Sequence, residues 1–294
     1  MHEKKTEMIL SMVIFGSIGV FVRLIPMSSA AVACFRGICG ALFILLYSAV
    51  RRIRFEREHL KSNMKILLVS GAAIGANWIL LFEAYRYTSV AVATLCYYMQ
   101  PVFVILLSPF ITGEKLSVRR LICVICSLAG MVLITGIASG KSIGAGELRG
   151  ILLGLGAAML YASVIFLNKR LKDISDMEMT FFQLLYAGLA VMPYALMGKE
   201  AFFPSMSALQ WCVLLTMGLV HTGAAYTLYF GSMKTLSAQT TALFSYIDPV
   251  CAIFFSAVLL REPLTAAVIA GALLILGPTM VTEMSSAKGA EKGN

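Results

Sequence analysis

The sequence is poor in charged residues. Only 13% of its 294 residues are Asp, Glu, Lys or Arg, whereas 59% are hydrophobic. A soluble domain carries about 25% charged and about 45–50% apolar residues. A chain with so few charges lacks the polar side chains to cover a water-facing surface. This shortage excludes an ordinary soluble domain and favours a protein whose solvent is lipid.

Histidines and the sequence motifs of catalytic or metal-binding sites are also scarce. Of the three histidines, only His221 falls inside an apolar run, while His2 and His59 lie in charged segments. No H-E-x-x-H zinc motif and no G-x-x-x-x-G-K-[ST] phosphate loop occurs. The C-x-x-C pair Cys123 and Cys126 lies in an apolar run and is interpreted as packing. The sequence therefore predicts no enzyme, no metal site and no cofactor.

The net charge of +9 comes without a basic stripe interleaved with aromatic residues, which excludes nucleic-acid binding. Lys and Arg instead lie between apolar runs, where they set membrane orientation. With the N-terminus in the cytoplasm, 17 of the 24 Lys and Arg residues fall on the cytoplasmic side and six on the other. Both termini are therefore predicted to be cytoplasmic, in a multi-pass protein of the cell membrane, the inner membrane of a bacterium.

Ten apolar runs are long enough to span a bilayer, which takes about 20 mostly apolar residues per helix. The predicted fold is an all-α polytopic membrane protein. Residues 283–294, rich in Ser, Lys, Gly and Glu, are predicted to form a disordered cytoplasmic tail. The predicted spans are Met8–Ile25, Ala30–Val50, Lys65–Ala84, Val90–Thr112, Val118–Ala138, Leu148–Asn168, Met179–Met197, Ala208–Gly231, Ala238–Leu260 and Leu264–Thr282.

The second half of the chain repeats the first at a nearly constant offset. Residues 98–102 (Tyr-Met-Gln-Pro-Val) match residues 246–250 (Tyr-Ile-Asp-Pro-Val), 148 positions later. Nearer the N-terminus, Phe15-Gly16-Ser17 matches Tyr161-Ala162-Ser163 at an offset of 146. Agreement in order at several points indicates an internal duplication.

The two predicted repeats, residues 8–138 and 148–282, each contain five spans. Because five is odd, the repeats face opposite ways in the membrane. Inverted repeats are typical of transporters that bind their substrate near the midplane. The first span has a counterpart inside the chain, so we expect a permanent helix and no cleaved signal peptide. The pairs Gly71-x-x-x-Gly75 and Gly150-x-x-x-Gly154 predict close helix packing.

A pattern that runs from a proline to Glu-x-Leu occurs twice. The first copy is Gln100-Pro101 through Glu114-Lys115-Leu116, and the second is Asp248-Pro249 through Glu262-Pro263-Leu264. Together with Phe15-Gly16-Ser17, Arg36 and residues 84–89, these motifs resemble the drug/metabolite transporter superfamily, in its ten-helix EamA-type branch. The likeness covers residues 8–282.

The resemblance implies secondary transport of small metabolites, often export of amino acids or related compounds. It also implies a central cavity lined by the first, third, fourth, sixth, eighth and ninth spans. The sequence departs from the common pattern at Phe15, where many members carry Trp, and at Asp248, where a neutral residue is frequent. A charge at Asp248 bears on the substrate class.

Two charges inside predicted spans are the main candidates for chemistry, because a mid-helix charge costs about 2.5–3.5 kcal/mol to insert. Asp248, beside Pro249, attracts a cationic substrate, takes up a proton, or serves as a structural partner of Arg36. Arg36 binds a substrate carboxylate or has a structural or gating role. The second role is favoured for Arg36, because its span is not part of the implied cavity. We assign both residues to coupling or gating, and Asp248 also to substrate binding.

His221 is a second candidate for both substrate binding and coupling, because histidine changes protonation near neutral pH. Ala224, Ala225 and Leu228 share its helical face and leave room for a ligand or a close helix. The remaining substrate-binding candidates are deep aromatic and amide side chains that suit amphipathic compounds. They are Asn77, Trp78, Tyr98, Gln100, Tyr161, Tyr226 and Tyr246.

Equivalent positions in the two repeats carry further expectations. Tyr98 and Tyr246 are expected on two sides of one cavity. Glu114 and Glu262 are expected to share a structural task, such as pairing with another charge or capping the N-terminus of the next helix.

The sequence therefore predicts a secondary-active permease or exporter of small metabolites, amino acids or related amphipathic compounds. It would work by alternating access, with protons as the candidate coupling ion. A lipid-carrier or lipid-linked metabolite flippase of the same fold is the alternative. A channel would show charge rings or a filter loop, and neither is visible. The predicted partners are a small-molecule substrate and the lipid bilayer, with the chain acting as a monomer or homodimer.

Overall fold

The computed structural model describes residues 2–53, 55–113, 116–136, 143–198, 201–233, 235–236 and 238–292. Within these residues the regular structure is helical and no strand occurs. Eight helical stretches have the length and composition to cross a membrane, and two shorter apolar stretches, Leu243–Leu259 and Ala266–Thr282, accompany them. The predicted polytopic all-α fold of about ten spans is therefore confirmed.

The described residues of the first half form six helices. They are α1 (His2–Arg23), α2 (Ser29–Val50), α3 (Arg57–Tyr87), α4 (Val90–Tyr97), α5 (Gln100–Ile111) and α6 (Val118–Thr135). Two predictions for this half were imprecise. Helix α3 begins well before Lys65, and the predicted span Val90–Thr112 is divided into α4 and α5.

In the second half, the part of the chain that the structure describes forms seven α-helices and a π-helical turn. They are α7 (Ala145–Asn168), α8 (Asp176–Met197), α9 (Ala208–Gly218), η2 (Leu219–Ala224), α10 (Ala225–Met233), α11 (Ala238–Ser245), α12 (Ile247–Leu259) and α13 (Ala266–Lys292). Helix α13 continues past its apolar stretch, so the backbone of residues 283–292 is helical where disorder was predicted.

Serine side chains fix where several helices begin. The first turn of a helix leaves N–H groups without intrahelical partners, and a serine hydroxyl just before it accepts one of them. Ser28 does so for α2 and Ser89 for α4. Ser175 and Ser207 form capping boxes with Glu178 and Gln210 at the starts of α8 and α9.

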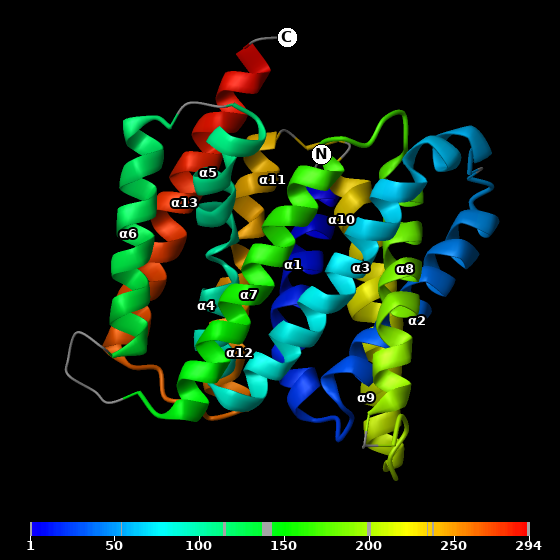
Figure 1. Ribbon diagram of the computed structural model, residues 1–294, viewed down its shortest axis with the longest axis horizontal. Coiled ribbons are helices and arrows are strands. Elements are labelled where there is room, and N and C mark those ends of the chain that lie inside the picture. Colours follow the sequence, from blue (N-terminus) through cyan, green and yellow to red (C-terminus); the bar gives the residue numbers. More distant parts are fainter. Residues whose placement is uncertain are drawn as a thin grey trace.

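The two halves have opposite orientations. Figure 1 shows α1 running from the top of the view to the bottom, whereas its repeat counterpart α7 runs from bottom to top. The N-terminal end of α1 and the C-terminal end of α13 lie at the same end of the bundle. Ten crossings return the chain to the side on which it started, so this placement agrees with an even number of spans.

The helix packing follows the same two-fold relation. Helix α1 packs against α10 and α12, and its counterpart α7 packs against α3 and α5, which are the counterparts of those two helices. The pairs α2 with α8 and α6 with α13 map onto themselves when the halves are exchanged. An inverted duplication produces this pattern. Exchanging the two halves turns each helix–helix contact either into an equivalent contact elsewhere or into itself.

The predicted glycine contacts are present. A Cβ added to Gly75 would lie 2.7 Å from the carbonyl oxygen of Ala187 in α8. A Cβ added to Gly154 of α7 would lie 2.8 Å from the side chain of Cys96 in α4. Both separations are closer than real Cβ contacts, so these helices approach to a distance that only glycine permits.

Several polar side chains are buried inside the bundle beside an apolar core, and many large apolar side chains face outward. Arg36, Asn77, Gln183 and His221 are buried. Large apolar residues face outward on many helices, among them Leu46, Ile125, Phe254 and Leu273. This arrangement is stable in a bilayer, because lipid solvates the apolar exterior but cannot hydrogen-bond a polar group.

Candidate functional site

Both halves break their fourth span at equivalent tyrosines. Tyr98 lies between α4 and α5 with ψ 4°, and Tyr246 lies between α11 and α12 with ψ −6°. Pro101 and Pro249 follow each tyrosine by three residues and have no N–H to donate to the carbonyl four residues earlier. The missing hydrogen bond accounts for a break at this point in each half. Discontinuous helices of this kind build the binding sites of many transporters.

The two breaks meet through one hydrogen bond. The Tyr98 hydroxyl donates to Oδ2 of Asp248 over 2.8 Å, and the rings of Tyr98 and Tyr246 are 6.5 Å apart at their centroids. In the described part of the chain, no other hydrogen bond reaches the Asp248 carboxylate and no cation pairs with it. We call Tyr98, Tyr246 and Asp248 the Asp248 centre.

Arg36 forms a second centre on α2. Its side chain is only 2% exposed. Its Nε donates to Oγ1 of Thr222 over 3.1 Å, and its guanidinium carbon lies 4.5 Å from the ring centroid of Trp78 and 5.2 Å from that of Phe82. A desolvated cation over an aromatic face gains about 2 kcal/mol. We call these four residues the Arg36 centre.

Arg36 and Asp248 do not form an ion pair in this structure. Among the described residues the ion pairs do not include one between them. Each charge instead has neutral polar or aromatic neighbours. The hypothesis that Asp248 is the structural counter-ion of Arg36 is therefore not supported by this conformation.

His221 lies in the π-helical turn η2 and faces α1. Its Nε2 is 2.8 Å from the Ser17 hydroxyl, its Nδ1 is 3.3 Å from the Thr216 carbonyl, and its ring is 4.4 Å from that of Phe21. A π-turn inserts an extra residue into the helix and often marks a functional site. The space beside His221 is thus filled by a close helix, one of the two options that the sequence left open.

Aromatic side chains connect the predicted candidates. Tyr161 of α7 packs on Tyr97 with centroids 5.8 Å apart, and Tyr97 in turn contacts Tyr98 at 6.0 Å. Tyr226 of α10 packs on Phe15 of α1 at 5.1 Å. Tyr226 is also within electrostatic range of both Arg36 and Asp248.

Sequence reasoning missed Tyr97 and Phe82. Tyr97 directly precedes the helix break at Tyr98, and a second tyrosine beside a break was the available signal. Phe82 lies four residues after Trp78, so both rings share one face of α3. That spacing marks an aromatic surface on the helix, but it does not reveal that Arg36 covers it.

The two predicted amides have different surroundings. Asn77 donates from Nδ2 to the carbonyl of Ala157 over 2.5 Å, and so ties α3 to α7. Gln100 is the repeat counterpart of Asp248. Within the described residues the buried Oδ1 of Asn77 and Oε1 of Gln100 have no hydrogen-bond partner. A buried polar atom without a partner is costly, so both oxygens keep unused hydrogen-bonding capacity inside the bundle.

The Glu262 carboxylate links helices of the two halves at one end of the bundle. Oε2 of Glu262 accepts from the Val90 backbone N–H over 2.8 Å and from the Ser256 hydroxyl over 2.7 Å. Its Oε1 pairs with Arg23 at 3.3 Å, and Arg23 also donates to the Thr88 carbonyl over 2.8 Å. We call these five residues the Glu262 clasp. It joins α1 and α4 of the first half to the end of α12.

Glu262 pairs with Arg23, which is one of the two tasks expected of it, but the helix that it caps is not the one expected. The residue caps α4 in the other half and not the following helix α13, whose first turn is met by Thr265 through the N–H of Val268. Glu114, its repeat counterpart, lies outside the described residues.

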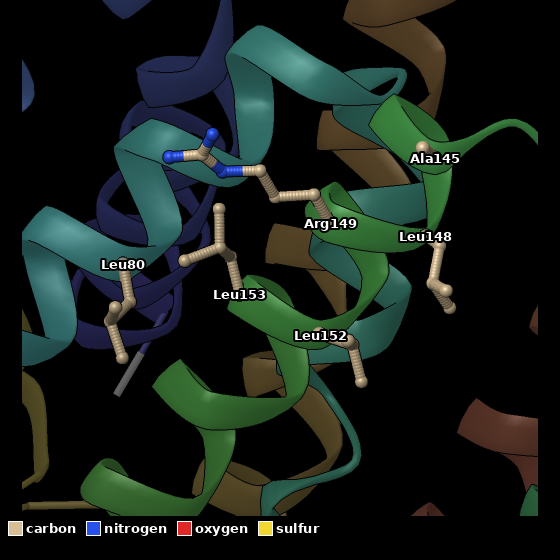
Figure 2. A pocket seen from close by; sticks show the side chains of 6 residues that line it. All are labelled: Leu80, Ala145, Leu148, Arg149, Leu152 and Leu153. Carbon is tan, nitrogen blue, oxygen red and sulfur yellow. The ribbon is translucent and has the colours of Figure 1, made fainter.

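A surface groove of about 360 Å³ lies apart from both centres. Figure 2 shows its lining side chains, which come from α3 and α7. The lining residues are Leu80, Ala145, Leu148, Arg149, Leu152 and Leu153. None of them belongs to the predicted site. The Arg149 guanidinium is held over the Tyr87 ring at 4.4 Å.

Comparison with known proteins places this geometry in a family. The model of the EamA-like transporter family matches the chain twice, at residues 7–136 and 148–283. The chain belongs to the EamA-like transporter family. It is therefore a multi-pass membrane transporter, as the motifs implied. The two matched segments parallel the repeats at residues 8–138 and 148–282.

Individual relatives agree with this assignment. The chain is 31% identical to the "Uncharacterized transporter YxxF" of Bacillus subtilis over 253 residues, covering 86% of this chain and 80% of the relative. It is 25% identical to the "Aromatic amino acid exporter YddG" of Ancylobacter novellus over 203 residues, covering 68% and 70%.

A solved structure supports the fold. The protein described as "Crystal structure of protein" superposes with a TM-score of 0.67 at 18% identity, covering 99% of each chain. At this identity the likeness shows the fold alone.

Proposed function

We propose that the protein is a secondary-active exporter of amino acids or related small amphipathic compounds, working by alternating access in a bacterial inner membrane. The observation that carries this proposal is the meeting of two broken helices from inverted halves at Tyr98 and Asp248. A site shared by both halves can face either side of the membrane when the halves exchange conformations.

The surroundings of the site support a substrate with an apolar or aromatic part. Tyr97, Tyr98, Tyr161 and Tyr226 provide flat apolar faces with hydroxyl groups at their rims. Binding pockets for small molecules commonly combine such faces with a few polar groups. The relative that is named an aromatic amino acid exporter points the same way.

Asp248 is the proposed proton carrier. A carboxylate inside a bilayer-spanning bundle is functional by default, because its charge is costly there. It has only the Tyr98 hydroxyl as a hydrogen-bond donor in the described part of the chain. Taking up a proton removes the charge and allows the bundle to rearrange around it. His221 and Ser17, which join η2 to α1, are proposed to follow that rearrangement as a gate.

The Glu262 clasp indicates on which side of the membrane the bundle is closed in this conformation of the proposed cycle. With both termini in the cytoplasm, the clasp lies at the end of the bundle away from the cytoplasm. The conformation described here is then closed toward the outside. Release of substrate to the outside requires Glu262 to leave Val90 and Arg23.

Flux measurements on purified protein test the proposal. Liposomes that contain the full chain are loaded with a mixture of the twenty amino acids, and efflux is followed with and without a pH gradient. We expect selective efflux of aromatic or large apolar amino acids that accelerates with the gradient. Efflux no faster than from protein-free liposomes for every compound contradicts transport of this class.

The surface groove of Figure 2 favours a second candidate, a flippase for lipid-linked cargo. The groove has four leucines that suit acyl chains and one cation, Arg149. A fluorescent phospholipid flipping assay on the same liposomes distinguishes the two. Flipping that Arg149→Gln abolishes, with no amino-acid efflux, favours the flippase.

A further inference from the structure

The span that contains His221 holds one residue more than a regular α-helix would. It runs through α9, η2 and α10, and the middle element, η2 (Leu219–Ala224), is π-helical. A π-helical turn inserts an extra residue into an α-helix and often marks a functional site. The equivalent residues 71–76 of the first half, 148 positions earlier, lie in α3 (Arg57–Tyr87), which is α-helical throughout. The extra residue is therefore a feature of the second half alone in this span.

Two side chains of η2 reach carbonyl groups at the π-helical spacing. The Thr222 hydroxyl donates to the Met217 carbonyl over 2.9 Å. Nδ1 of His221 lies 3.3 Å from the Thr216 carbonyl. Each contact spans five residues. The other serine and threonine hydroxyls that donate to carbonyls within the described helices reach back three or four residues, as is usual in an α-helix. The side chains of η2 thus help to hold the turn in its π-helical form.

Two neighbouring residues join the turn to two different helices. Nε of Arg36 in α2 donates to Oγ1 of Thr222 over 3.1 Å. Nε2 of His221 is 2.8 Å from the Ser17 hydroxyl of α1. The span also changes its main partner here, since α9 packs mainly against α2 and α10 mainly against α1. The extra residue therefore lies where the span passes from one partner helix to the other.

Glycines fit the turn closely to α2. A Cβ added to Gly40 would lie 2.4 Å from Cγ2 of Thr222, and one added to Gly223 would lie 2.3 Å from Cγ of Phe43. Real Cβ contacts are not this short, so each element has a glycine where the other places a side chain. This fit fixes how η2 is rotated against α2, and with it the direction of His221.

The Arg36 side chain is itself held in place. Its guanidinium lies over the rings of Trp78 and Phe82 in α3, at 4.5 and 5.2 Å from their centroids, and the residue is buried. A hydrogen bond from a charged donor is stronger than one between neutral groups. Among the described residues, the bond from Arg36 to Thr222 is the one hydrogen bond that a charged side chain donates to η2. It connects the turn to α2 and, through the aromatic rings, to α3.

We infer that Arg36 is a positioning residue, because its bond to Thr222 holds the π-helical turn that directs His221 toward α1. In an α-helical turn the residues of η2 would take other directions around the helix axis. The inference deepens the proposed function and rests on it, since the contact between His221 and Ser17 is the gate proposed above. It gives Arg36 a task in transport that requires neither contact with the substrate nor a counter-ion.

Nuclear magnetic resonance reports the direction of His221 without a transport assay. The chain contains three histidines, so isotope labelling of the imidazole nitrogens gives few signals from the purified full chain in detergent. His2→Gln and His59→Gln assign these signals by elimination. Ser17→Ala removes the partner of Nε2 and supplies the reference signal of a His221 that has lost this contact.

Substitutions at Arg36 and Thr222 test the positioning. We expect Arg36→Gln and Thr222→Val to move the His221 signal to the reference position, and Thr222→Ser, which keeps the hydroxyl, to retain the wild-type signal. The controls are Arg51→Gln, at the exposed end of α2, and Thr227→Val, whose hydroxyl bond spans four residues, and neither is expected to move the signal. An unchanged signal in Arg36→Gln overturns the inference. If that variant does not fold, the same outcome in Thr222→Val does so.

A pair of single-residue deletions tests the turn itself. Val220 lies in η2 with an exposed side chain, and its deletion removes the extra residue while α9 and α10 keep their registers. Ala72, 148 positions earlier, lies in the regular helix α3, where a deletion rotates one end of the helix against the other by about 100°.

The two deletions are expected to have opposite outcomes. The chain without Val220 should keep a cooperative unfolding transition in detergent and show a moved His221 signal. The chain without Ala72 should lose that transition. Loss of folding in both deletions, or a wild-type His221 signal after deletion of Val220, overturns the inference.

Transport shows whether the direction of His221 matters for function. Efflux of the amino-acid mixture from liposomes is expected to fall at least about tenfold in Thr222→Val, because a hydrogen bond to a charged group contributes about that factor. Efflux should recover in Thr222→Ser and stay at the wild-type level in Thr227→Val. A moved His221 signal with wild-type efflux in Thr222→Val overturns the inference, since transport then does not depend on where His221 points.

The two kinds of measurement keep this inference apart from the proposed function. Wild-type protein that shows no efflux of any amino acid, while Arg36→Gln moves the His221 signal, overturns the proposed function and supports the positioning by Arg36. Selective efflux by the wild-type protein, together with an unchanged signal in Arg36→Gln, supports the proposed function and overturns the inference.

Discussion

The breaks in the two halves share their backbone and differ in their chemistry. Tyr98 and Tyr246 occupy the same position, and a proline follows each by three residues. Between tyrosine and proline, however, the first half has Gln100 and the second has Asp248. Duplication thus preserved the geometry that opens the helix, while the ionisable group is present on one side only. If Asp248 carries the proton, as proposed, a single group in the middle of a two-fold arrangement serves both orientations of the bundle.

The strongest test of this asymmetry is Asp248→Asn. We expect proton-driven flux to fall by about 100-fold, because the amide cannot take up or release a proton. Flux in liposomes with a pH gradient measures the effect. Asp173→Asn, the same exchange at an exposed position between α7 and α8, is the control, and we expect it to keep the gradient dependence. Wild-type flux in Asp248→Asn with the gradient still felt would exclude Asp248 from coupling.

The double exchange Gln100→Asp with Asp248→Gln sharpens the comparison. If the breaks are equivalent, a carboxylate placed in the first half can be reached by Tyr246 as Asp248 is now reached by Tyr98. We expect partial recovery of the gradient-driven flux relative to Asp248→Asn alone. No recovery in a folded double variant would show that the halves differ in more than this residue.

Substitutions at the close glycine contacts between helices should lower the stability of the protein. Gly75→Ala places a methyl group 2.7 Å from the Ala187 carbonyl, and overpacking of this kind costs about 1–3 kcal/mol. A lower unfolding temperature in detergent measures it. Gly231→Ala, where no atom lies within 4 Å of the added carbon, serves as the control and is expected to be neutral or slightly stabilising.

The Glu262 clasp should have a smaller effect on stability and a larger one on conformation. Glu262→Gln keeps the shape but loses the charge that holds Arg23 and the α4 N-terminus, at a cost of about 1–2 kcal/mol. We expect faster labelling of Cys251 by a water-soluble maleimide, resolved by mass spectrometry. Glu58→Gln, at the exposed start of α3, is the control. Equal labelling of both variants would contradict a role in closure.

The smallest predicted effect concerns the tyrosine that joins the halves. Tyr98→Phe removes one hydrogen bond to Asp248, which contributes about 0.5–1.5 kcal/mol, so substrate flux should change only a few-fold. Tyr194→Phe, on the exposed surface of α8, provides the control. A loss as large as that of Asp248→Asn would show that the Tyr98 hydroxyl takes part in proton transfer itself.

Much of the fold was predictable because lipid imposes a simple rule. A run of about 20 apolar residues has few alternatives to a spanning helix. The offset between Tyr98 and Tyr246 revealed the duplication, and the odd number of spans per repeat gave the inversion. The glycine pairs gave two helix contacts, because Gly75 and Gly154 leave room only for a close neighbour.

The candidate site was only partly predictable. Tyr98, Tyr246 and Asp248 were chosen from the repeat and do come together. The neighbours of Arg36 were not foreseen, since Trp78, Phe82 and Thr222 come from two other helices. Nor was the π-helical turn around His221, because a one-residue insertion leaves the hydrophobic pattern of a span almost unchanged.

Sequence alone determined the solvent, the number of spans, the inverted duplication and the family, since each follows from composition or from order along the chain. Tertiary structure decided which charges meet. Arg36 and Asp248 both lie inside spans, and an ion pair between them was a reasonable expectation from sequence. Their separation by tyrosines depends on how α2, α4, α10 and α12 pack. Contacts between distant segments arise from packing and leave no local pattern in the sequence.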